Sequence, residues 1–318
     1  MILEPNSYDE IIEVVKESIA SKKKVIAIGT GRHVIGNIKP DIIITMRRLN
    51  KILEVSQSDL YVISQTGISI KELNEELKRS GLWLPFDYNG TIGGLTATNL
   101  PLWYTYPREL LLGAKFINGE GKVIRSGGKT TKFSSGYKIW KILAGSLGRL
   151  GIILEVIYRV LPLPEITILA SFDPEEWRKV FEYSPLSVMV IYKDNREIGI
   201  AKFAGLKRVI DKIPLKETNF DLDLDGENIV SVISPLGLEV NDARALRKFM
   251  KVECSVSLIG KGYTRAYVKD LNGIEEARSS GLNVIVEKGK DFSVENFVPI
   301  SNTFKLLKRA LDPYNVFP

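Results

Sequence analysis

The chain has 318 residues, of which 44% are hydrophobic and 26% are charged. This is ordinary globular usage, which excludes a disordered or fibrous protein, and a chain of this length is expected to form two domains. The formal net charge of +6 is spread along the chain, so it gives no reason to expect a nucleic acid partner but favours anionic ligands.

Cysteine and histidine each occur once, as Cys254 and His33. One cysteine excludes an internal disulfide and a cysteine-built zinc site or cluster, and one histidine excludes a multi-histidine metal site, so we expect no metal. The N-terminal segment lacks a signal-peptide pattern, and no apolar run approaches the roughly 20 residues of a membrane span. These features predict a soluble, cytoplasmic protein without a membrane span.

The first part of the chain predicts alternating helices and strands. Ser7 and Asp9 precede apolar residues at helical spacing, Ile11, Ile12, Val15 and Ile19, which is typical of a capped amphipathic helix. Two buried strands and a second helix are expected to follow, at Val25–Ile28, Asp41–Thr45 and Lys71–Ser80.

The next segment predicts a hairpin and ends at a domain boundary. Asn118–Gly121 is a turn signal between two strand patterns, Gly113–Ile117 and Lys122–Arg125. A helix at Tyr137–Leu143, a glycine-rich passage at Gly145–Gly151 and a long strand at Ile152–Leu161 follow. Pro162 and Pro164 then mark the boundary.

Beyond the prolines, strands and helices mix without a glycine-rich fingerprint, which predicts an antiparallel sheet with helices on one face. The strand patterns are Ile166–Ser171, Ser187–Tyr192, Ile198–Phe203, Val230–Ile233, Glu253–Leu258, Tyr263–Val268 and Val284–Val286. The helical patterns are Pro174–Glu182, Asp242–Met250 and Asn272–Ser280. We therefore expect an α+β fold with a first domain over 1–164, a small cap domain over 165–300, and a helical segment over 301–318 that returns to the first domain.

A first glycine cluster, Gly29, Thr30, Gly31, Arg32 and His33, directly follows a predicted strand. Glycines let the backbone adopt positive φ and present several N–H groups to one anion, such as a pyrophosphate. A plain strand-ending turn explains so short a cluster equally well. The third glycine of G-x-G-x-x-G is missing, which disfavours a dinucleotide-binding Rossmann domain.

Two further clusters strengthen the case for a bound ligand. Thr91–Asn99 reads as a small-residue loop in which Gly93 and Gly94 permit close backbone approach and threonine hydroxyls can bond phosphate oxygens. Gly136-Tyr137 with Ala144–Gly151 has too many glycines for a helix and too few polar residues for a linker. A flat ligand packed against backbone accounts for this pattern.

Taken in order, these motifs resemble the PCMH-type FAD-binding domain of the vanillyl-alcohol-oxidase class, over residues 1 to about 164. The matching motifs are Thr91–Gly94, Arg108–Gly113, Gly119–Gly121, Gly127-Gly128, Gly136-Tyr137, Gly145-Ser146, Leu150-Gly151 and Pro162. The run from Arg125 to Pro164 is most similar to the smaller FAD-binding subunit of the glycolate oxidase complex, and Leu311–Pro318 resembles the family's closing segment.

The resemblance implies a two-subdomain FAD-binding domain, a cap domain and FAD as the cofactor. The residues it implies at the cofactor are Gly29, Thr30, Gly31, Arg32, His33, Thr91, Ile92, Gly93, Gly94, Thr98, Gly136, Tyr137, Gly145, Ser146, Gly148, Gly151 and Ile152. Some relatives attach FAD covalently through a histidine near the position of His33, although a lone histidine is more often a hydrogen-bonding or core residue.

The chain departs from the family pattern at two places. Lys132–Lys138 lacks the asparagine and aspartate that the family usually carries near the flavin. Trp103, Tyr104 and Tyr106 replace a glycine-rich stretch, and these aromatics either wall the flavin or fill the core. The core is the favoured interpretation.

The activity that the resemblance implies is hydride transfer to flavin N5 from a small 2-hydroxy acid such as glycolate or lactate. Such a site needs a cation for the carboxylate, and Arg32, Arg108 and Arg265 are available, although an exposed structural role is favoured for each. It also needs a base, for which Tyr263 and Tyr137 are only guesses, so the catalytic residues stay unassigned.

An alternative is an accessory flavin or electron-transfer subunit whose partner chain, a second flavoprotein or an iron–sulfur subunit, holds the substrate site. The small, histidine-free cap supports it. UDP-N-acetylenolpyruvoylglucosamine reductase is disfavoured because its Gly-Ser-Asn and Tyr-Arg-x-Ser stretches are missing. The FAD subunit of molybdenum hydroxylases shares Thr91–Gly94 but lacks the 145–151 passage. A degenerate, empty site is also open.

Overall fold

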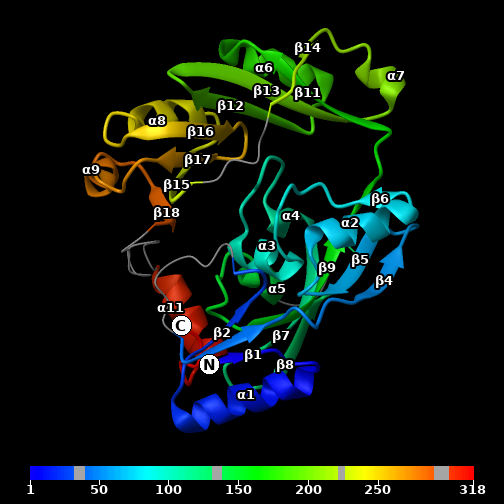
Figure 1. The fold of residues 1–318 in the computed structure, drawn as a ribbon, viewed down its shortest axis with the longest axis vertical. Coiled ribbons are helices and arrows are strands. Elements are labelled where there is room, and N and C mark those ends of the chain that lie inside the picture. The colour runs from blue at the N-terminus through cyan, green and yellow to red at the C-terminus, as the bar shows by residue number, and fades with distance from the viewer. Residues whose placement is uncertain (32–39, 131–137, 221–225, 290–300) are drawn as a thin grey trace.

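The computed structural model describes residues 1–31, 40–130, 138–220, 226–289 and 301–318. Figure 1 shows two halves, with the N-terminal elements and both chain ends in the lower one and a large sheet with its helices in the upper one. In the described part of the chain, no helix is both long and apolar enough to cross a membrane.

The chain begins with a small parallel sheet. Its strands lie in the order β1 (Ile2–Leu3), β3 (Ile42–Thr45) and β2 (Val25–Ile28). Helix α1 (Tyr8–Ser21) connects β1 to β2, and the Ser7 side chain caps it by accepting the N–H of Glu10 at 3.3 Å. Ile11 and Val15 are fully buried in the core beneath this sheet, as the helical spacing predicted.

An antiparallel sheet of five strands forms the rest of the lower half, in the order β4-β5-β9-β7-β8. Its strands are β4 (Ile52–Ser56), β5 (Tyr61–Gln65), β9 (Ile152–Arg159), β7 (Leu111–Ile117) and β8 (Val123–Gly127). The short strands β6 (Leu82–Trp83) and β10 (Leu161–Pro162) pair with each other. The helices are α2 (Ile70–Arg79), α3 (Ile92–Thr98), α4 (Pro107–Leu110) and α5 (Ile139–Leu143).

The upper half is built on one antiparallel sheet of eight strands, in the order β14-β11-β13-β12-β16-β17-β15-β18. Its strands are β11 (Ile166–Phe172), β12 (Ser187–Lys193), β13 (Arg196–Gly205), β14 (Lys216–Glu217), β15 (Asn228–Ile233), β16 (Val252–Leu258), β17 (Tyr263–Val268) and β18 (Val284–Lys288). The helices are η1 (Pro174–Glu176), α6 (Trp177–Val180), η2 (Phe181–Tyr183), α7 (Lys207–Ile210), α8 (Glu239–Leu246) and α9 (Ile274–Ser279).

The two faces of this eight-stranded sheet have different neighbours. Val188 and Val190 of β12 lie in a cluster with residues of α6 and α7, whereas Met189 and Ile191, which alternate with them, belong to the core shared with the lower half. Helices α8 and α9 pack on the helical face as well. The prediction of an antiparallel sheet with helices on one face is confirmed, and its other face, the inner face, is turned toward the lower half (Figure 1).

The end of the chain lies against its beginning. Helix α11 (Asn302–Leu311) leads to Asp312, whose fully buried side chain accepts the N–H groups of Val316 at 2.8 Å and Phe317 at 2.9 Å. The N–H of Val25 donates to the carbonyl of Val316 at 2.9 Å. The exact division into 1–164, 165–300 and 301–318 stays a prediction.

Three local predictions were wrong. The segment expected as a loop at 91–99 is helix α3, the hairpin β4–β5 was not predicted, and the helix expected at 174–182 is broken into η1, α6 and η2. Two glycines in a helix cost roughly 1 kcal/mol each, so propensity argued against α3. Burial of Ile92 and Leu95 in the core, together with the cap at Thr91, outweighs that cost.

Candidate cofactor and substrate site

The glycine clusters described in the structure come together around helix α3. A Cβ at Gly29 would lie 2.1 Å from Thr91 Oγ1, so the turn after β2 touches the residue that caps α3. At the other end of the helix, the N–H of Gly145 donates to the carbonyl of Thr96 at 3.1 Å, and the N–H of Leu147 donates to that of Ala97 at 3.0 Å. Segments far apart in sequence therefore build one surface.

Some predicted cofactor residues lie outside the described residues, namely Arg32, His33, Gly136 and Tyr137. Covalent attachment at His33 accordingly stays a prediction. In the described part of the first cluster, Thr30 and Gly31 are exposed, and Gly31 has a φ of +74°. This is the left-handed turn expected of a glycine at that place.

The glycines of α3 serve packing and do not free backbone donors. The N–H groups of Ile92, Gly93 and Gly94 donate within the protein, to Ile68 O at 2.9 Å, Thr66 O at 3.0 Å and Thr91 Oγ1 at 3.1 Å. A Cβ at Gly93 would lie 2.7 Å from Thr66 Cβ, so only glycine fits there. The hydroxyl of Thr98 also donates within the helix, to the carbonyl of Gly94 at 2.9 Å. These amides are therefore bonded within the protein, and the contact of Thr91–Gly94 and Thr98 with the cofactor stays a prediction.

Two other predicted residues, Ile92 and Ile152, bury their side chains in the apolar core, at 0% and 1% exposure. Contact of either with a cofactor would have to use the backbone. Gly151 lies against its own core as well, because a Cβ there would be 2.7 Å from the carbonyl oxygen of Ile117. These three positions therefore pack within the core beneath the surface around α3.

Ser146 offers a buried polar group that suits a cofactor. The residue is 2% exposed, and its hydroxyl has no hydrogen-bond partner among the described residues. The turn around it is tight, with positive φ at Gly145, Leu147 and Gly148. A buried hydroxyl without a partner costs about 1–3 kcal/mol, and a polar ligand at this surface would remove that cost. The arrangement therefore fits FAD.

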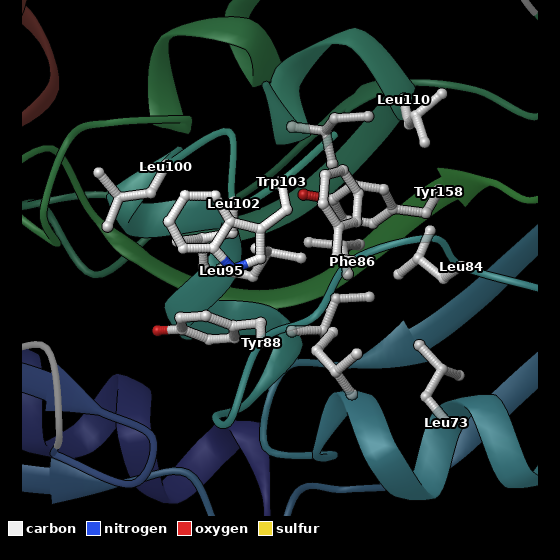
Figure 2. Close-up of a cluster of buried hydrophobic side chains, with 14 of the residues drawn as sticks. Leu73, Leu84, Phe86, Tyr88, Leu95, Leu100, Leu102, Trp103, Leu110 and Tyr158 are labelled. Carbon is white, nitrogen blue, oxygen red and sulfur yellow. The ribbon is translucent and has the colours of Figure 1, made fainter. Parts of the chain in front are cut away.

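Tyr88 is a neighbour of α3 that the sequence did not reveal. A Cβ at Gly94 would lie 3.0 Å from its hydroxyl oxygen, and burial raises the pKa of Tyr88 to about 12, partly offset by a hydrogen bond with Thr98. Figure 2 shows the Tyr88 ring at the edge of the core, with its hydroxyl directed away from Leu73 and Leu84. At neutral pH this hydroxyl is protonated. The turn signal of Asn89-Gly90 directly before Thr91 is the only sequence feature that pointed here.

The aromatic stretch fills the core, as favoured from the sequence. Trp103 is 4% exposed, although it holds a φ of +57°, and it lies in the cluster drawn in Figure 2. Tyr104 packs edge-on against Phe86 with ring centroids 6.0 Å apart. Tyr106 reaches across to the upper half, where its ring meets Tyr263 edge-on at 6.4 Å.

The inner face of the eight-stranded sheet carries a buried charged cluster. Arg265 Nε lies 2.9 Å from Glu287 Oε2, and the two side chains are 7% and 4% exposed. These atoms are misaligned for a hydrogen bond, so the contact is an ion pair. Glu287 also accepts the hydroxyl protons of Tyr263, at 2.6 Å, and Ser231.

This cluster changes the roles considered for its members. Burial alone would lower the pKa of Arg265, but Glu287 and the neighbouring tyrosines raise it overall, so the guanidinium stays charged. Arg265 also lowers the pKa of Tyr88, although burial of Tyr88 is the larger effect and raises it. Burial and Glu287 hold the pKa of Tyr263 well above its usual value, so Tyr263 is poorly suited as a base. Arg108 is exposed and stacks over the Tyr106 ring at 5.1 Å.

In the described ranges, no group of three or more histidine, cysteine, aspartate or glutamate side chains is placed to hold an ion, and the expectation of no metal stays a prediction.

Comparison with known proteins by sequence concerns the first part of the chain. Residues 1–127 match the family model described as an FAD binding domain. The chain is 28% identical over 185 residues to the glycolate oxidase subunit GlcD of Bacillus subtilis, covering 54% of this chain and 39% of that protein. It is 29% identical to a D-lactate dehydrogenase of Anaerostipes hadrus, covering 53% and 38% of the two chains. The matched segment therefore spans well under half the length of these relatives.

A structural comparison extends over the whole chain. An alkyldihydroxyacetonephosphate synthase superposes with a TM-score of 0.70 at 17% identity, covering 99% of this chain and 75% of that one. At this identity the likeness concerns the fold alone. The predictions of a PCMH-type FAD-binding fold and of FAD as the cofactor are confirmed.

Proposed function

We propose, taking the FAD-binding domain as the premise, that this chain carries the flavin of an oxidoreductase acting on a small 2-hydroxy acid such as glycolate or lactate. The relatives support the substrate class, since they are named for glycolate, D-lactate and, at 29% identity, D-2-hydroxyglutarate in Xanthomonas citri. The observation that carries the proposal is the surface around α3, where Gly29 meets Thr91 at one end of the helix and the turn with the unpartnered Ser146 packs against the other end.

A bound FAD would supply the two-electron acceptor for oxidation at the hydroxyl-bearing carbon. The residues of the chain would bind and orient the cofactor and the substrate. The Ser146 hydroxyl would bond a polar group of the cofactor, and Arg265, on the inner face of the cap sheet, would attract a carboxylate. The Tyr88 hydroxyl, protonated at neutral pH, would act as a donor.

A second candidate is an accessory subunit that carries flavin while a partner chain, either another flavoprotein or an iron–sulfur subunit, binds the substrate. Two observations favour it. Glu287 already neutralises Arg265, and Tyr263 is held in its protonated form, so the described inner face lacks both an unpaired arginine and a ready base. The name of the Bacillus subtilis relative, an oxidase subunit, is compatible with such an assembly.

One experiment separates these functions. The purified chain is loaded with FAD, freed of oxygen and mixed with glycolate, D-lactate or L-lactate while the flavin absorption is followed. Bleaching by glycolate, or by one enantiomer of lactate and not the other, supports the oxidoreductase. Flavin that binds but never bleaches supports the accessory subunit. Failure to bind FAD at all would contradict both.

A further inference from the structure

A cavity of about 570 Å³ opens at the edge of the cap sheet. Its walls come from both halves, because Leu169 and Lys202 of the sheet and Asp87 of the lower half line it. Strands β12 and β16 lie between Lys202 on β13 and Arg265 on β17. At about 4.8 Å per strand, about 14 Å of sheet separates the two cations. The cavity therefore has its own cation, Lys202, and Arg265 does not line it.

Lys202 is an under-bonded buried cation in this cavity. Its side chain is 9% exposed, and the ion pair it makes is with Asp87, whose side chain is 55% exposed. An ammonium group has three donors, and among the described residues only Asp87 takes one. Burying a charge is costly unless hydrogen bonds and an opposite charge compensate for it. Two donors are therefore left for a ligand.

A second buried polar group beside Lys202 also lacks a partner. Ser187 of β12 lies directly opposite Lys202 in the register of the sheet, and paired residues project from the same face. Ser187 is 6% exposed, and its hydroxyl has no hydrogen-bond partner among the described residues. Ser187 does not itself line the cavity, so the case for a polar ligand rests on Lys202 and on the polar walls.

The remaining walls define the chemistry of that ligand. Thr167, Thr218 and Asn219 can each donate and accept hydrogen bonds, while Glu217 and Asp87 only accept when ionised. Hydroxyl groups satisfy such walls, whereas a second carboxylate on the ligand would be repelled by them. Leu169 and Phe220 provide apolar surface for the carbon chain.

We propose that this cavity binds a sugar acid, a molecule with one carboxylate and several hydroxyl groups. The carboxylate bonds the Lys202 ammonium, and the hydroxyls bond the threonine, asparagine and carboxylate walls. Pockets of 300–1,000 Å³ hold drug-sized molecules, and a two- or three-carbon acid would leave most of this one empty. The proposal goes beyond the oxidation proposed above and does not depend on it.

Titration calorimetry on the FAD-loaded protein tests this with three probes, D-gluconate, its neutral counterpart D-sorbitol and its dicarboxylate counterpart D-glucarate. D-Gluconate should bind one to one, and the other two at least tenfold more weakly. Lys202→Met should weaken the binding of D-gluconate at least tenfold. Lys216 is an exposed lysine of the neighbouring β14, and Lys216→Met should leave that binding unchanged. Because Asp87 is half exposed, it stays hydrated in the Lys202→Met protein.

A second variant tests the cavity in case the Lys202→Met protein does not fold. Leu169 pairs directly with Lys202 in the sheet, so Leu169→Trp should fill the cavity and abolish binding of D-gluconate without removing a charge. No saturable binding of D-gluconate, or equal binding by the wild-type and Lys202→Met proteins, would overturn the proposal. Bleaching of the flavin by lactate is a separate measurement. The result with D-gluconate therefore neither supports nor contradicts the proposed oxidation of a 2-hydroxy acid.

Discussion

Gly29 lies so close to Thr91 that a methyl group in its place would come within 2.1 Å of Thr91 Oγ1 and 2.9 Å of Thr91 Cγ2. The threonine cannot turn away freely, because its hydroxyl accepts the N–H of Gly94 at 3.1 Å and its residue is 4% exposed. This contact joins the parallel sheet to helix α3, and it fixes the position of the turn after β2 relative to the rest of the proposed cofactor surface.

Gly29→Ala should therefore weaken FAD binding at least tenfold and lower the free energy of unfolding by about 1–3 kcal/mol, the usual cost of overpacking. Fluorescence titration with FAD and urea unfolding measure the two effects. Gly205→Ala is the control, since its new Cβ would meet nothing within 4 Å and its φ is not in the left-handed region. Normal FAD affinity in Gly29→Ala would show that the turn does not touch the cofactor.

Ser146→Ala should raise the stability of the protein without FAD and lower its affinity for FAD. Removing a buried hydroxyl without a partner should stabilise the empty protein by about 1 kcal/mol, while the lost hydrogen bond should weaken FAD binding five- to tenfold. Ser64→Ala is the matched control, because the Ser64 hydroxyl of β5 is equally buried and unpartnered. It should stabilise the protein without changing FAD affinity. An unaltered affinity in Ser146→Ala would remove Ser146 from the cofactor site.

The sequence predicted those elements whose periodicity and boundary signals agree. Helix α1 combines a Ser7 cap with apolar residues at helical spacing, and the strand patterns at Glu253–Leu258 and Tyr263–Val268 correspond to β16 and β17. It failed at α3, where the glycines lower helix propensity but are required by the close approach of Thr66 and Tyr88. Such a requirement arises from tertiary packing and leaves no local pattern.

The candidate site was predictable in part for the same reason. The glycine clusters are local patterns, so Gly29, Thr91 and Ser146 could be named from the sequence, and their contact with the cofactor stays a prediction. A single tyrosine, lysine or glutamate carries no signal in the sequence by itself. The roles considered for Tyr88, Lys202 and Glu287 depend on contacts with residues distant in the chain. The cation Arg265 was considered, but its neutralisation by Glu287 follows from the pairing of β15 with both β17 and β18.

Cys254, the only cysteine, should be a slow thiol in the folded protein. Burial raises the pKa of its thiol from 9.0 to about 11, and because only the thiolate reacts, reaction with a disulfide reagent at pH 8 should be about 100-fold slower than in urea. Since the folded-state pKa is the higher one, the thiol's contribution to stability is complete below pH 9 and is lost as the pH rises through 11. Cys254→Ala should reduce that alkaline loss. Equal reaction rates with and without urea would contradict the burial.

Replacing one member of the Arg265–Glu287 ion pair should destabilise the protein much more than replacing both members. Arg265→Met or Glu287→Leu alone leaves a buried charge uncompensated, which costs about 3–5 kcal/mol of unfolding free energy. The double variant should lose less than either single one, because no lone charge remains. Urea unfolding of all four proteins gives the coupling energy. Lys129→Met, at an exposed pair with Glu54, is the control and should change stability little. Additive losses in the double variant would mean that Arg265 and Glu287 do not compensate for each other's charge.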